Sequence, residues 1–301
     1  MNNLPFGKPG RFYRGNLHTH STRSDGRLSP EAVCQFYKDM GYDFLAITDH
    51  FMESYRYPIT DTAPFRTPNF TTLLGAELHA GLTSVGEAWH ILAVGLPSDF
   101  APNLPNETGP EIAARALAAG AFVVCAHPAW YALSEKDVID LGKVHAIETI
   151  NAISDDHSDR IDSWYMVDTM LAQGRHYTAI ATDDAHFQER HSDRVRGWVW
   201  VKAETLTPES MLESLKTGWF YSSTGPQIHD LRIDNNTLRI RCSPASSIFV
   251  TGKGSRSVYK HGKGMIDAEL SISNLKSPYC RVTVRDQHGG RAWTNPIWFT
   301  V

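Results

Sequence analysis

The 301-residue chain has few cysteines and no long hydrophobic run. Its four cysteines, at positions 34, 125, 242 and 280, show no CxxC spacing, which argues against a disulfide framework and a structural zinc knuckle. No stretch approaches the roughly 18 consecutive apolar residues of a membrane helix, and the N-terminus lacks the apolar segment of a signal peptide. We therefore expect a cytoplasmic protein without membrane contact, and a bridge between Cys242 and Cys280 is the less favoured alternative.

The chain also lacks an excess of positive charge. Lys and Arg number 29 against 33 Asp and Glu, and the net charge of -4 argues against general nucleic-acid binding. Apolar residues make up 42% and charged residues 21%, as in ordinary globular proteins. The length fits either one barrel of roughly 200 to 250 residues with a small module or two medium domains. None of this indicates an oligomeric state.

One stretch near the N-terminus is rich in side chains that suit a divalent metal: His18, His20, Asp25 and His50. We expect His18 and His20 at the end of a strand, where a spacing of two projects both side chains to the same face. Asp25 and Gly26 predict a turn that returns a carboxylate over that face. A lone pair of histidines is more typical of structural positions, so the metal-binding interpretation depends on the rest of the chain.

Apolar runs alternate with helix signals as far as Pro226. The expected strands are 16–20, 44–48, 73–77, 90–94, 122–126, 146–150, 179–182, 197–202 and 219–223. The expected helices are 30–40, 110–119, 134–141, 158–172 and 208–216, and 51–69 is expected to be a long loop. This repetition predicts an α/β fold with a largely parallel sheet, most simply a closed barrel.

Beyond Pro226 the helical periods end and short alternating runs follow, at 229–233, 237–242, 247–251, 265–272, 280–285 and 296–301. They predict a small all-β sandwich of about six strands. The predicted domains are therefore 1–226 and 227–301. Segment 252–256 is similar to a phosphate-binding loop, but no helix follows it, which favours a basic β-hairpin.

Further side chains with metal-binding chemistry recur at the ends of the later strands. They are His50, Glu77, His90, His127, Asp184 and His186. Because barrel active sites form at the edge where the carboxyl ends of the strands meet, we expect these side chains to gather there. The alternative, that they are unrelated polar residues at strand ends, requires six of the 14 histidines, His18 and His20 included, to fall at such positions by coincidence.

These motifs resemble those of the PHP (polymerase and histidinol phosphatase) superfamily of metal-dependent phosphoesterases. The resemblance covers about residues 14–226 and rests on His18-Thr-His20, Ser24-Asp25-Gly26, Thr48-Asp49-His50, Gly75-Ala-Glu77, His90, Ala126-His127-Pro128 and Asp184-Ala-His186. It implies a distorted (β/α)7 barrel of TIM-like type. The C-terminal module, which ends in Ala292-Trp-Thr-Asn-Pro296, resembles less specifically that of the CehA/McbA-like branch.

The resemblance also implies two or three divalent metal ions in a trinuclear site. The implied ligand sets are His18, His20, Glu77 and Asp184; Glu77, His90 and His127; and Asp25, His50 and His186. Nitrogen and oxygen ligands without thiolate fit Zn, Mn or Fe and do not distinguish them. The family usually has Gly-Ser-Asp-x-His where this chain has Asp183 followed by Asp184. Asp184 shares a face with His186, so we expect Asp184 to be the ligand and Asp183 a neighbour.

Clustered metals suggest hydrolysis. Two ions about 4 Å apart can lower the pKa of a bridging water from about 15.7 to about 7 and present hydroxide to phosphorus or to a carbonyl carbon. No Ser or Cys nucleophile is apparent. Candidate contributors to catalysis are Arg23, His157 and His191, and candidate substrate contacts are Arg23, Arg160, Arg194, Arg196 and Asn151. For the arginines and for His157 and His191 the alternative is an ordinary exposed side chain.

The sequence does not decide the roles of two further polar residues, His79 and Glu148. His79 follows Glu77 by two positions and shares its expected face, but a structural role is the simpler interpretation. Glu148, like Asn151, follows an expected barrel strand and fits either a residue that supports a metal ligand or a substrate contact.

We therefore expect a metal-dependent hydrolase of the phosphoric-ester type that acts on a small phosphorylated metabolite or nucleotide. The tail similar to the CehA/McbA-like branch suggests an alternative, hydrolysis of a carboxyl ester or carbamate. A third hypothesis is a non-catalytic, metal-stabilised scaffold that carries a binding module. The complete set of ligands argues against it.

Overall fold

One β-sheet runs through the chain in the computed structural model, which describes residues 4–299. Its strands are β1 Arg11–Asn16, β2 Phe44–Ile47, β3 His50–Phe51, β4 Thr71–Leu78, β5 Ile91–Val94, β6 Phe122–Cys125, β7 Ala146–Asn151, β8 Thr178–Thr182, β9 Trp198–Ala203, β10 Phe220–Ser223, β11 Ile228–Asp234, β12 Thr237–Thr251, β13 Ser257–Ser271, β14 Tyr279–Arg285, β15 Arg291–Thr294 and β16 Ile297–Trp298. The main order is β11-β12-β14-β15-β10-β9-β1-β2-β4-β5-β6-β7-β8, with β13 on β12, β16 on β14 and β3 on β4. The protein is thus mixed α/β.

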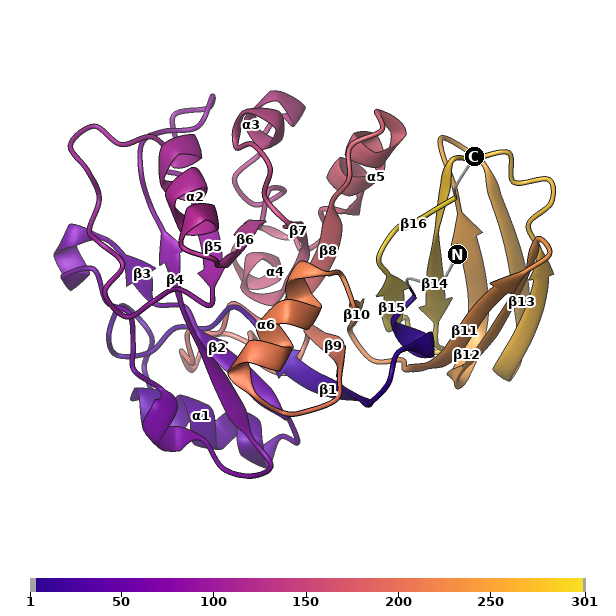
Figure 1. The fold of residues 1–301 in the computed structure, drawn as a ribbon, viewed down its shortest axis with the longest axis horizontal. Coiled ribbons are helices and arrows are strands. Elements are labelled where there is room, and N and C mark those ends of the chain that lie inside the picture. Colours follow the sequence, from indigo (N-terminus) through magenta and orange to yellow (C-terminus); the bar gives the residue numbers. More distant parts are fainter. Residues whose placement is uncertain (1–3, 300–301) are drawn as a thin grey trace.

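Six α-helices and three short 3-10 turns connect these strands. They are α1 Pro30–Asp39, α2 Gly109–Ala118, α3 Glu135–Asp140, α4 Ala152–Ser158, α5 Trp164–Ala172 and α6 Pro208–Lys216, with turns at Pro5–Gly7, Glu53–Tyr55 and Ala63–Phe65. All the α-helices belong to one part of the molecule, and the strands β11 to β16 form the other (Figure 1). Both chain ends lie in the second part.

Local sequence signals explain where the helices begin. The hydroxyl of Ser29 accepts a hydrogen bond from the amide of Ala32 at the start of α1, and Pro30 is its first residue. Thr108 and Ser134 form capping boxes at α2 and α3. Each cap satisfies an amide that has no partner within its helix, and these helices begin within a residue of the predicted positions.

From β1 to β8 the sheet is parallel except at β5, the strand that follows His90, whereas β9 is antiparallel to both β1 and β10. The pairs β1–β2, β2–β4, β6–β7 and β7–β8 are parallel, as predicted. β5 is antiparallel to both β4 and β6, which the prediction of a largely parallel sheet did not include. The reversal places the beginning of β5, next to His90, at the edge where β4 and β6 end.

The chain segments after β1 and after β8 meet at this same edge. Thr19 and Ala185 form an isolated parallel bridge. The amide of His20 donates to the carbonyl of Ala185 over 2.9 Å, and the amide of Asp184 donates to the carbonyl of His18 over 3.0 Å. These bonds bring two distant segments of the sequence side by side.

Two predicted elements in the α/β part are wrong. The first strand ends at Asn16, so the pair of metal-type histidines lies in the loop beyond it. The helix predicted at 158–172 is two helices, because Asp159 ends α4 in the left-handed conformation with φ 56°. The predicted loop at 51–69 also contains short regular pieces, which are Phe51, the second residue of β3, and two 3-10 turns.

Strand boundaries in the C-terminal part differ as well. The strands predicted at 237–242 and 247–251 are the single strand β12, because register shifts near Ala245 let it bend without ending. β13 begins eight residues before the predicted 265, at Ser257. The strand predicted at 296–301 is reduced to β16, and residues 300 and 301 lie outside the described residues.

The C-terminal part is joined to the α/β part by the sheet and by polar side chains. β15 pairs antiparallel with β10. The side chain of Asn295 accepts from the amide of Ala179 at 3.0 Å and donates to the carbonyls of Gly218 and Phe220 at 3.2 and 3.0 Å. The first described residues contribute too, since Leu4 and Phe6 pack against the apolar core of the C-terminal part.

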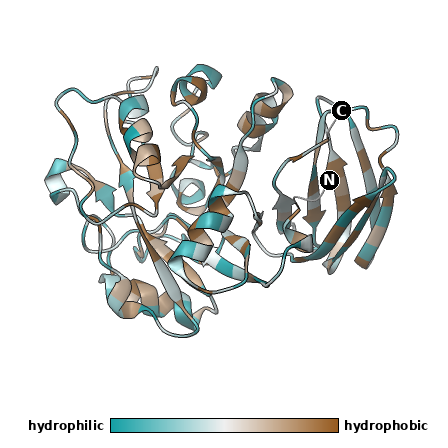
Figure 2. Cartoon of the chain, in the orientation of Figure 1, coloured by the Kyte–Doolittle hydropathy of each residue, from teal (hydrophilic) through white to brown (hydrophobic). Residues whose placement is uncertain are grey.

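The hydropathy of the residues differs between the helices and the strands. The helices carry both hydrophilic and hydrophobic residues, and hydrophobic residues gather along the strands (Figure 2). The cysteines at 34, 125, 242 and 280 are all buried and free. Within residues 4–299, no helix is long and apolar enough to cross a membrane.

We predict that an ion pair between the two parts contributes to stability. Arg281 on β14 binds Asp168 on α5 through two nitrogens, at 2.8 and 2.7 Å, and its guanidinium lies 4.4 Å from the ring of Trp164. Because Arg281 is buried and Asp168 partly exposed, Arg281→Met should lower the free energy of unfolding by about 1–3 kcal/mol. Urea denaturation measures this change.

Arg239→Met is the matched control. Arg239 pairs with Glu269 at 2.8 Å, but both side chains are mostly exposed, so the expected loss is below about 1 kcal/mol. Equal losses in the two variants would show that the pair between the two parts has no special weight.

Candidate metal centre

The structure brings all nine predicted ligand residues to the edge where β1, β4, β6 and β8 end and β5 begins. Loops after strands supply most of them, β3 and β4 supply two, and the turn after the β1 loop supplies one. They are His18, His20, Asp25, His50, Glu77, His90, His127, Asp184 and His186, and each has a nitrogen or oxygen atom within 4.0 Å of another member.

Asp184 is the centre of the first group. Its Oδ1 lies 3.1 Å from Nε2 of His18 and 2.9 Å from Nε2 of His20. All three side chains are buried, and these three atoms have no hydrogen-bond partner among the described residues. Buried polar atoms normally have a partner, so three unsatisfied atoms that face one another fit a bound cation.

Glu77 is the centre of the second group. Its Oε1 lies 2.8 Å from Nδ1 of His90 and 3.1 Å from Nε2 of His127, and its Oε2 lies 2.7 Å from Nδ1 of His50. Oε1 is also 3.5 Å from Nε2 of His18. Glu77 thus links the first group to the others.

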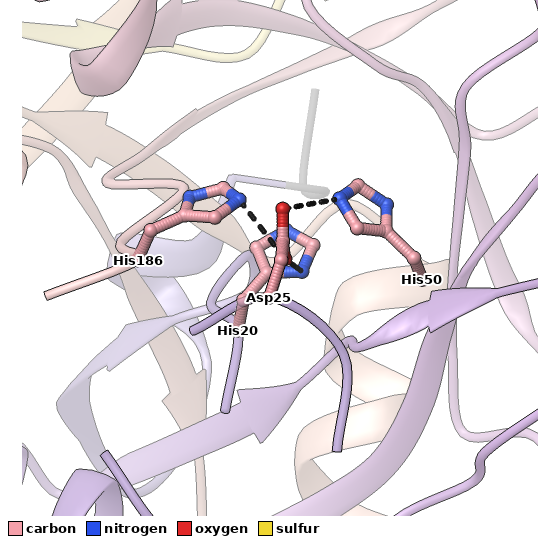
Figure 3. A group of neighbouring side chains, drawn as sticks. All are labelled: His20, Asp25, His50 and His186. Atoms are coloured by element: carbon pink, nitrogen blue, oxygen red, sulfur yellow. Dashed lines mark ion pairs between the residues drawn. The ribbon is translucent and has the colours of Figure 1, made fainter. Parts of the chain in front are cut away.

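Asp25 connects two histidines from opposite sides of the site. Its carboxylate lies between His50 and His186, with 3.4 Å to Nε2 of each (Figure 3). Gly26 makes the turn possible, because its amide donates to the carbonyl of Ser21 and a Cβ at this position would lie 2.5 Å from the carbonyl oxygen of His20.

Three sets of side chains are close enough to hold an ion each, and one of them contains a residue that the sequence did not favour. The sets are His18, His20 and Asp184; His20, Asp25, His50 and His186; and His50, Glu77, His79 and His90. His79 lies with its Nε2 2.8 Å from Nδ1 of His50 and is buried. Its spacing of two from Glu77 was the signal in the sequence.

Glu148 supports the first group from behind. One oxygen lies 2.9 Å from Nδ1 of His18 and accepts from the hydroxyl of Thr182, and the other accepts from the amide of His127 at 2.7 Å. Asn151 donates to Glu148 and to Asp184, at 3.0 Å each, and caps α4. Both residues therefore orient other side chains.

Asp183 is saturated by hydrogen bonds. It accepts from the hydroxyl of Tyr37 at 2.7 Å, from the amide side chain of Asn16 at 3.1 Å, and from three consecutive backbone amides at 195–197 over 2.7 to 2.9 Å. Burial raises the pKa of Asp183 to about 6 despite these donors. Its neighbour Asp184 has a free oxygen, whereas Asp183 joins α1 and β1 to the end of β8.

The carboxylates at the centre have only histidines as counter-charges. Within residues 4–299, no Lys or Arg forms an ion pair with Asp25, Glu77, Glu148 or Asp184. Burial opposes ionisation of Glu77, yet the nearby histidines hold its pKa well below its usual range. Burial likewise opposes protonation of His50, but Glu77 and Asp25 raise the pKa of His50 to about 10. Not every histidine is favoured in the charged form, because burial and neighbouring histidines lower the pKa of His20 to about 4 and the pKa of His90 to about 3.

A cavity of about 380 Å³ opens onto this cluster. Besides ligand-type residues, its lining includes Trp130, Tyr131, Ile153, His157, Gln188, Arg190 and His191. His157 and His191, both singled out from the sequence, therefore face the cavity, and their rings are 4.7 Å apart. Arg190 was missed, since nothing but its position beside His191 distinguished it in the sequence.

The arginines singled out from the sequence do not line this cavity. Arg23 is exposed and does not line the cavity. Arg160 donates to the carbonyl of Trp130, Arg194 donates to the carbonyl of His191, and Arg196 pairs with Asp155. These contacts orient loops around the cavity.

No protein-family profile and no curated protein sequence matches the chain. Solved structures do match. A two-domain protein from Bacteroides vulgatus, which contains a predicted PHP-like metal-dependent phosphoesterase, aligns over 96% of this chain and 97% of its own, with a TM-score of 0.54 and 16% identity. This chain therefore shares the fold of that two-domain protein.

Two further structures match part of the chain. A protein from Bifidobacterium adolescentis, described as a metal-dependent phosphoesterase, has 15% identity and a TM-score of 0.41. An amidohydrolase from Chromobacterium violaceum, solved with sulfate and no metal, has 16% identity and a TM-score of 0.43. Each match covers 57% of this chain and 87% of the other.

We predict that Glu148→Gln weakens metal binding without unfolding the protein. The variant removes the negative charge that orients the ring of His18, and loss of such support typically costs about 10–100-fold in metal affinity. Competition with a chromogenic chelator measures the affinity. Glu107→Gln is the control, because Glu107 is also buried but pairs with Arg115; equal effects in both variants would contradict the assigned role.

We also predict that His79→Ala reduces the amount of metal bound per chain, because one of the three sets loses a nitrogen ligand. Elemental analysis of the variant after dialysis against Mn or Zn tests this. His229→Ala changes an exposed histidine on β11 and should leave the metal content unaltered. Unchanged metal content in His79→Ala would restore the structural interpretation of this residue.

Proposed function

We propose that the protein is a metal-dependent phosphoesterase that hydrolyses a small phosphorylated metabolite or nucleotide. The observation that carries this proposal is the cluster of four carboxylates, three of them fully buried, surrounded by histidines with no Lys or Arg as counter-ion among the described residues. The fold shared with PHP-like phosphoesterases supports it. The EC 3.1 type of reaction follows from this proposal.

Two or three divalent ions fit the donor atoms. His18, His20 and Asp184 would hold one, Glu77 and His90 with His79 or His127 a second, and Asp25, His50 and His186 a third. Imidazole and carboxylate suit Zn, Mn or Fe. When bound, such ions supply Lewis acidity and lower the pKa of water near the substrate.

The residues of the cavity wall define what the chain itself contributes. Nε of Arg190 donates to Nε2 of His191 over 3.1 Å, so the proton of that ring is on Nδ1. Nδ1 of His191 is buried without a partner among the described residues. It can therefore donate to a phosphate oxygen or to the leaving group. Trp130 and Tyr131 form an aromatic wall that fits a planar or sugar-like group.

We propose that β1, β2, β4, β5, β6, β7 and β8 form a distorted seven-stranded barrel that closes where Thr19 meets Ala185. The first domain is then 1–226 and the second is a β-sandwich of 227–301. The free, buried cysteines are consistent with a reducing, cytoplasmic location.

We predict that the purified protein with Mn or Zn hydrolyses 4-nitrophenyl phosphate or bis(4-nitrophenyl) phosphate faster than 4-nitrophenyl N-methylcarbamate. His20→Ala should reduce this activity more than about 100-fold, because it removes the ring whose Nε2 lies 2.9 Å from Asp184 and whose Nδ1 lies 3.8 Å from Asp25. A chelator should abolish activity and added metal restore it. The absorbance of the released 4-nitrophenol is the assay.

His229→Ala is again the control and should retain full activity. Turnover of the carbamate without turnover of either phosphate ester would replace the phosphoesterase by the ester or carbamate hydrolase. Metal binding with no turnover of any of these compounds would favour the scaffold.

A further inference from the structure

A second cavity, of about 710 Å³, lies at the other end of the strands from the metal centre. It is lined by the loops that precede β7, β8 and β10 and by the segment around β16. Since β7 and β8 run about 17 to 20 Å from these loops to Glu148 and Asp184, a small ligand here does not reach the metal centre. The size is within the usual range of ligand sites, about 300–1,000 Å³.

The lining of this cavity is positively charged. Lys143, Arg175 and Lys216 all contribute to it, and no Asp or Glu does. None of these three cations forms an ion pair with a carboxylate among residues 4–299. Lys216 donates to the carbonyl of Gly120 over 2.8 Å, which neutralises no charge. In a chain with a net charge of -4, three cations around one cavity without a carboxylate partner attract an anion with more than one negative charge.

His145, which also lines the cavity, has one ring nitrogen fixed as a hydrogen-bond donor. The amide of Val123 donates to Nδ1 of His145 over 3.1 Å, so the proton of the neutral ring is on Nε2. Burial and the nearby Lys216 lower the pKa of His145, which keeps the ring neutral. His145 thus adds a hydrogen-bond donor beside the cations.

The remaining wall is aromatic. The rings of His176 and Trp298 stack with 3.9 Å between centroids and 20° between planes, and both line the cavity. His176 is exposed and Trp298 is half-buried, so Trp298 supports a flat surface at the edge of the charged region. Such a surface stacks with a planar ring, whereas the cations bind phosphate.

We propose that this cavity binds a nucleoside diphosphate, with its two phosphates at Lys143, Arg175 and Lys216 and its base on the ring of His176. A phosphate pair and a base match the two neighbouring halves of the wall, whereas an inorganic anion uses only one. This inference does not rest on the proposed hydrolase activity, because it uses none of the residues of the metal centre.

Titration calorimetry of the full chain with α,β-methylene-ADP tests the proposal, because the P–C–P link of this compound resists hydrolysis. We expect saturable binding that Arg175→Glu and Lys143→Glu each weaken more than about tenfold, since each removes a charge-assisted contact and adds repulsion. Lys260→Glu changes an exposed lysine on β13 and should bind as the unmodified chain does. Circular dichroism verifies that each variant is folded, and the exposed position of Lys143 makes unfolding of that variant unexpected.

One smaller probe and one further variant separate the halves of the site. Methylenediphosphonate should bind more weakly than the nucleotide, and His176→Ala should reduce binding of the nucleotide while leaving methylenediphosphonate unaffected. The proposal is overturned if the nucleotide does not bind, or if His20→Ala abolishes binding while Arg175→Glu retains it, since the ligand then occupies the metal centre. Hydrolysis of 4-nitrophenyl phosphate is measured separately and reports on the proposed function alone.

Discussion

Buried negative charge is the constraint on which the centre of this protein depends. Glu77, Glu148 and Asp184 are removed from water, and an isolated buried carboxylate is strongly unfavourable. The chain supplies imidazoles around them, each of which must give up its proton to a metal or keep it as the counter-charge. This geometry therefore favours the binding of cations. Without them, the buried carboxylates would leave uncompensated negative charge in the core.

The sheet topology decides which residues share that charge. The reversed direction of β5 lets His90 approach Glu77 from the beginning of a strand, and the bridge between Thr19 and Ala185 brings the loops after β1 and β8 together. Asp183, with its five donors, fixes the second of these loops. Rigid backbone contacts around each ligand leave the ligand side chains little freedom to reorganise.

Much of this arrangement could be predicted from the sequence, because local signals are strong where they concern helix starts, buried strands and polar strand ends. The nine ligand-type residues were found in that way. The strand directions were not, since the apolar run at 91–94 is the same for a parallel and an antiparallel neighbour. The break between α4 and α5 depends on one left-handed residue, Asp159, for which the helical pattern gives no warning.

Residues of the cavity wall were harder to predict from the sequence than the ligand-type residues. An arginine has no periodic pattern that separates a cavity wall from the surface, and Arg196 pairs with Asp155 whereas Arg190 lines the cavity. His79 was discounted because its environment in three dimensions, against His50 and His90, comes from strands that are adjacent only in the folded sheet. Contact between strands distant in sequence is the information that a linear pattern lacks.

The contacts of Asn295 have a consequence for how the chain is made. Its side chain completes the hydrogen bonding of Ala179, Gly218 and Phe220, and residues from the beginning of the chain pack in the same C-terminal part. During synthesis, the edge that Asn295 closes stays open until the chain has grown 116 residues beyond Ala179. The backbone of β8 at this edge is thus exposed for a long part of synthesis, and an incomplete chain has most need of a chaperone there.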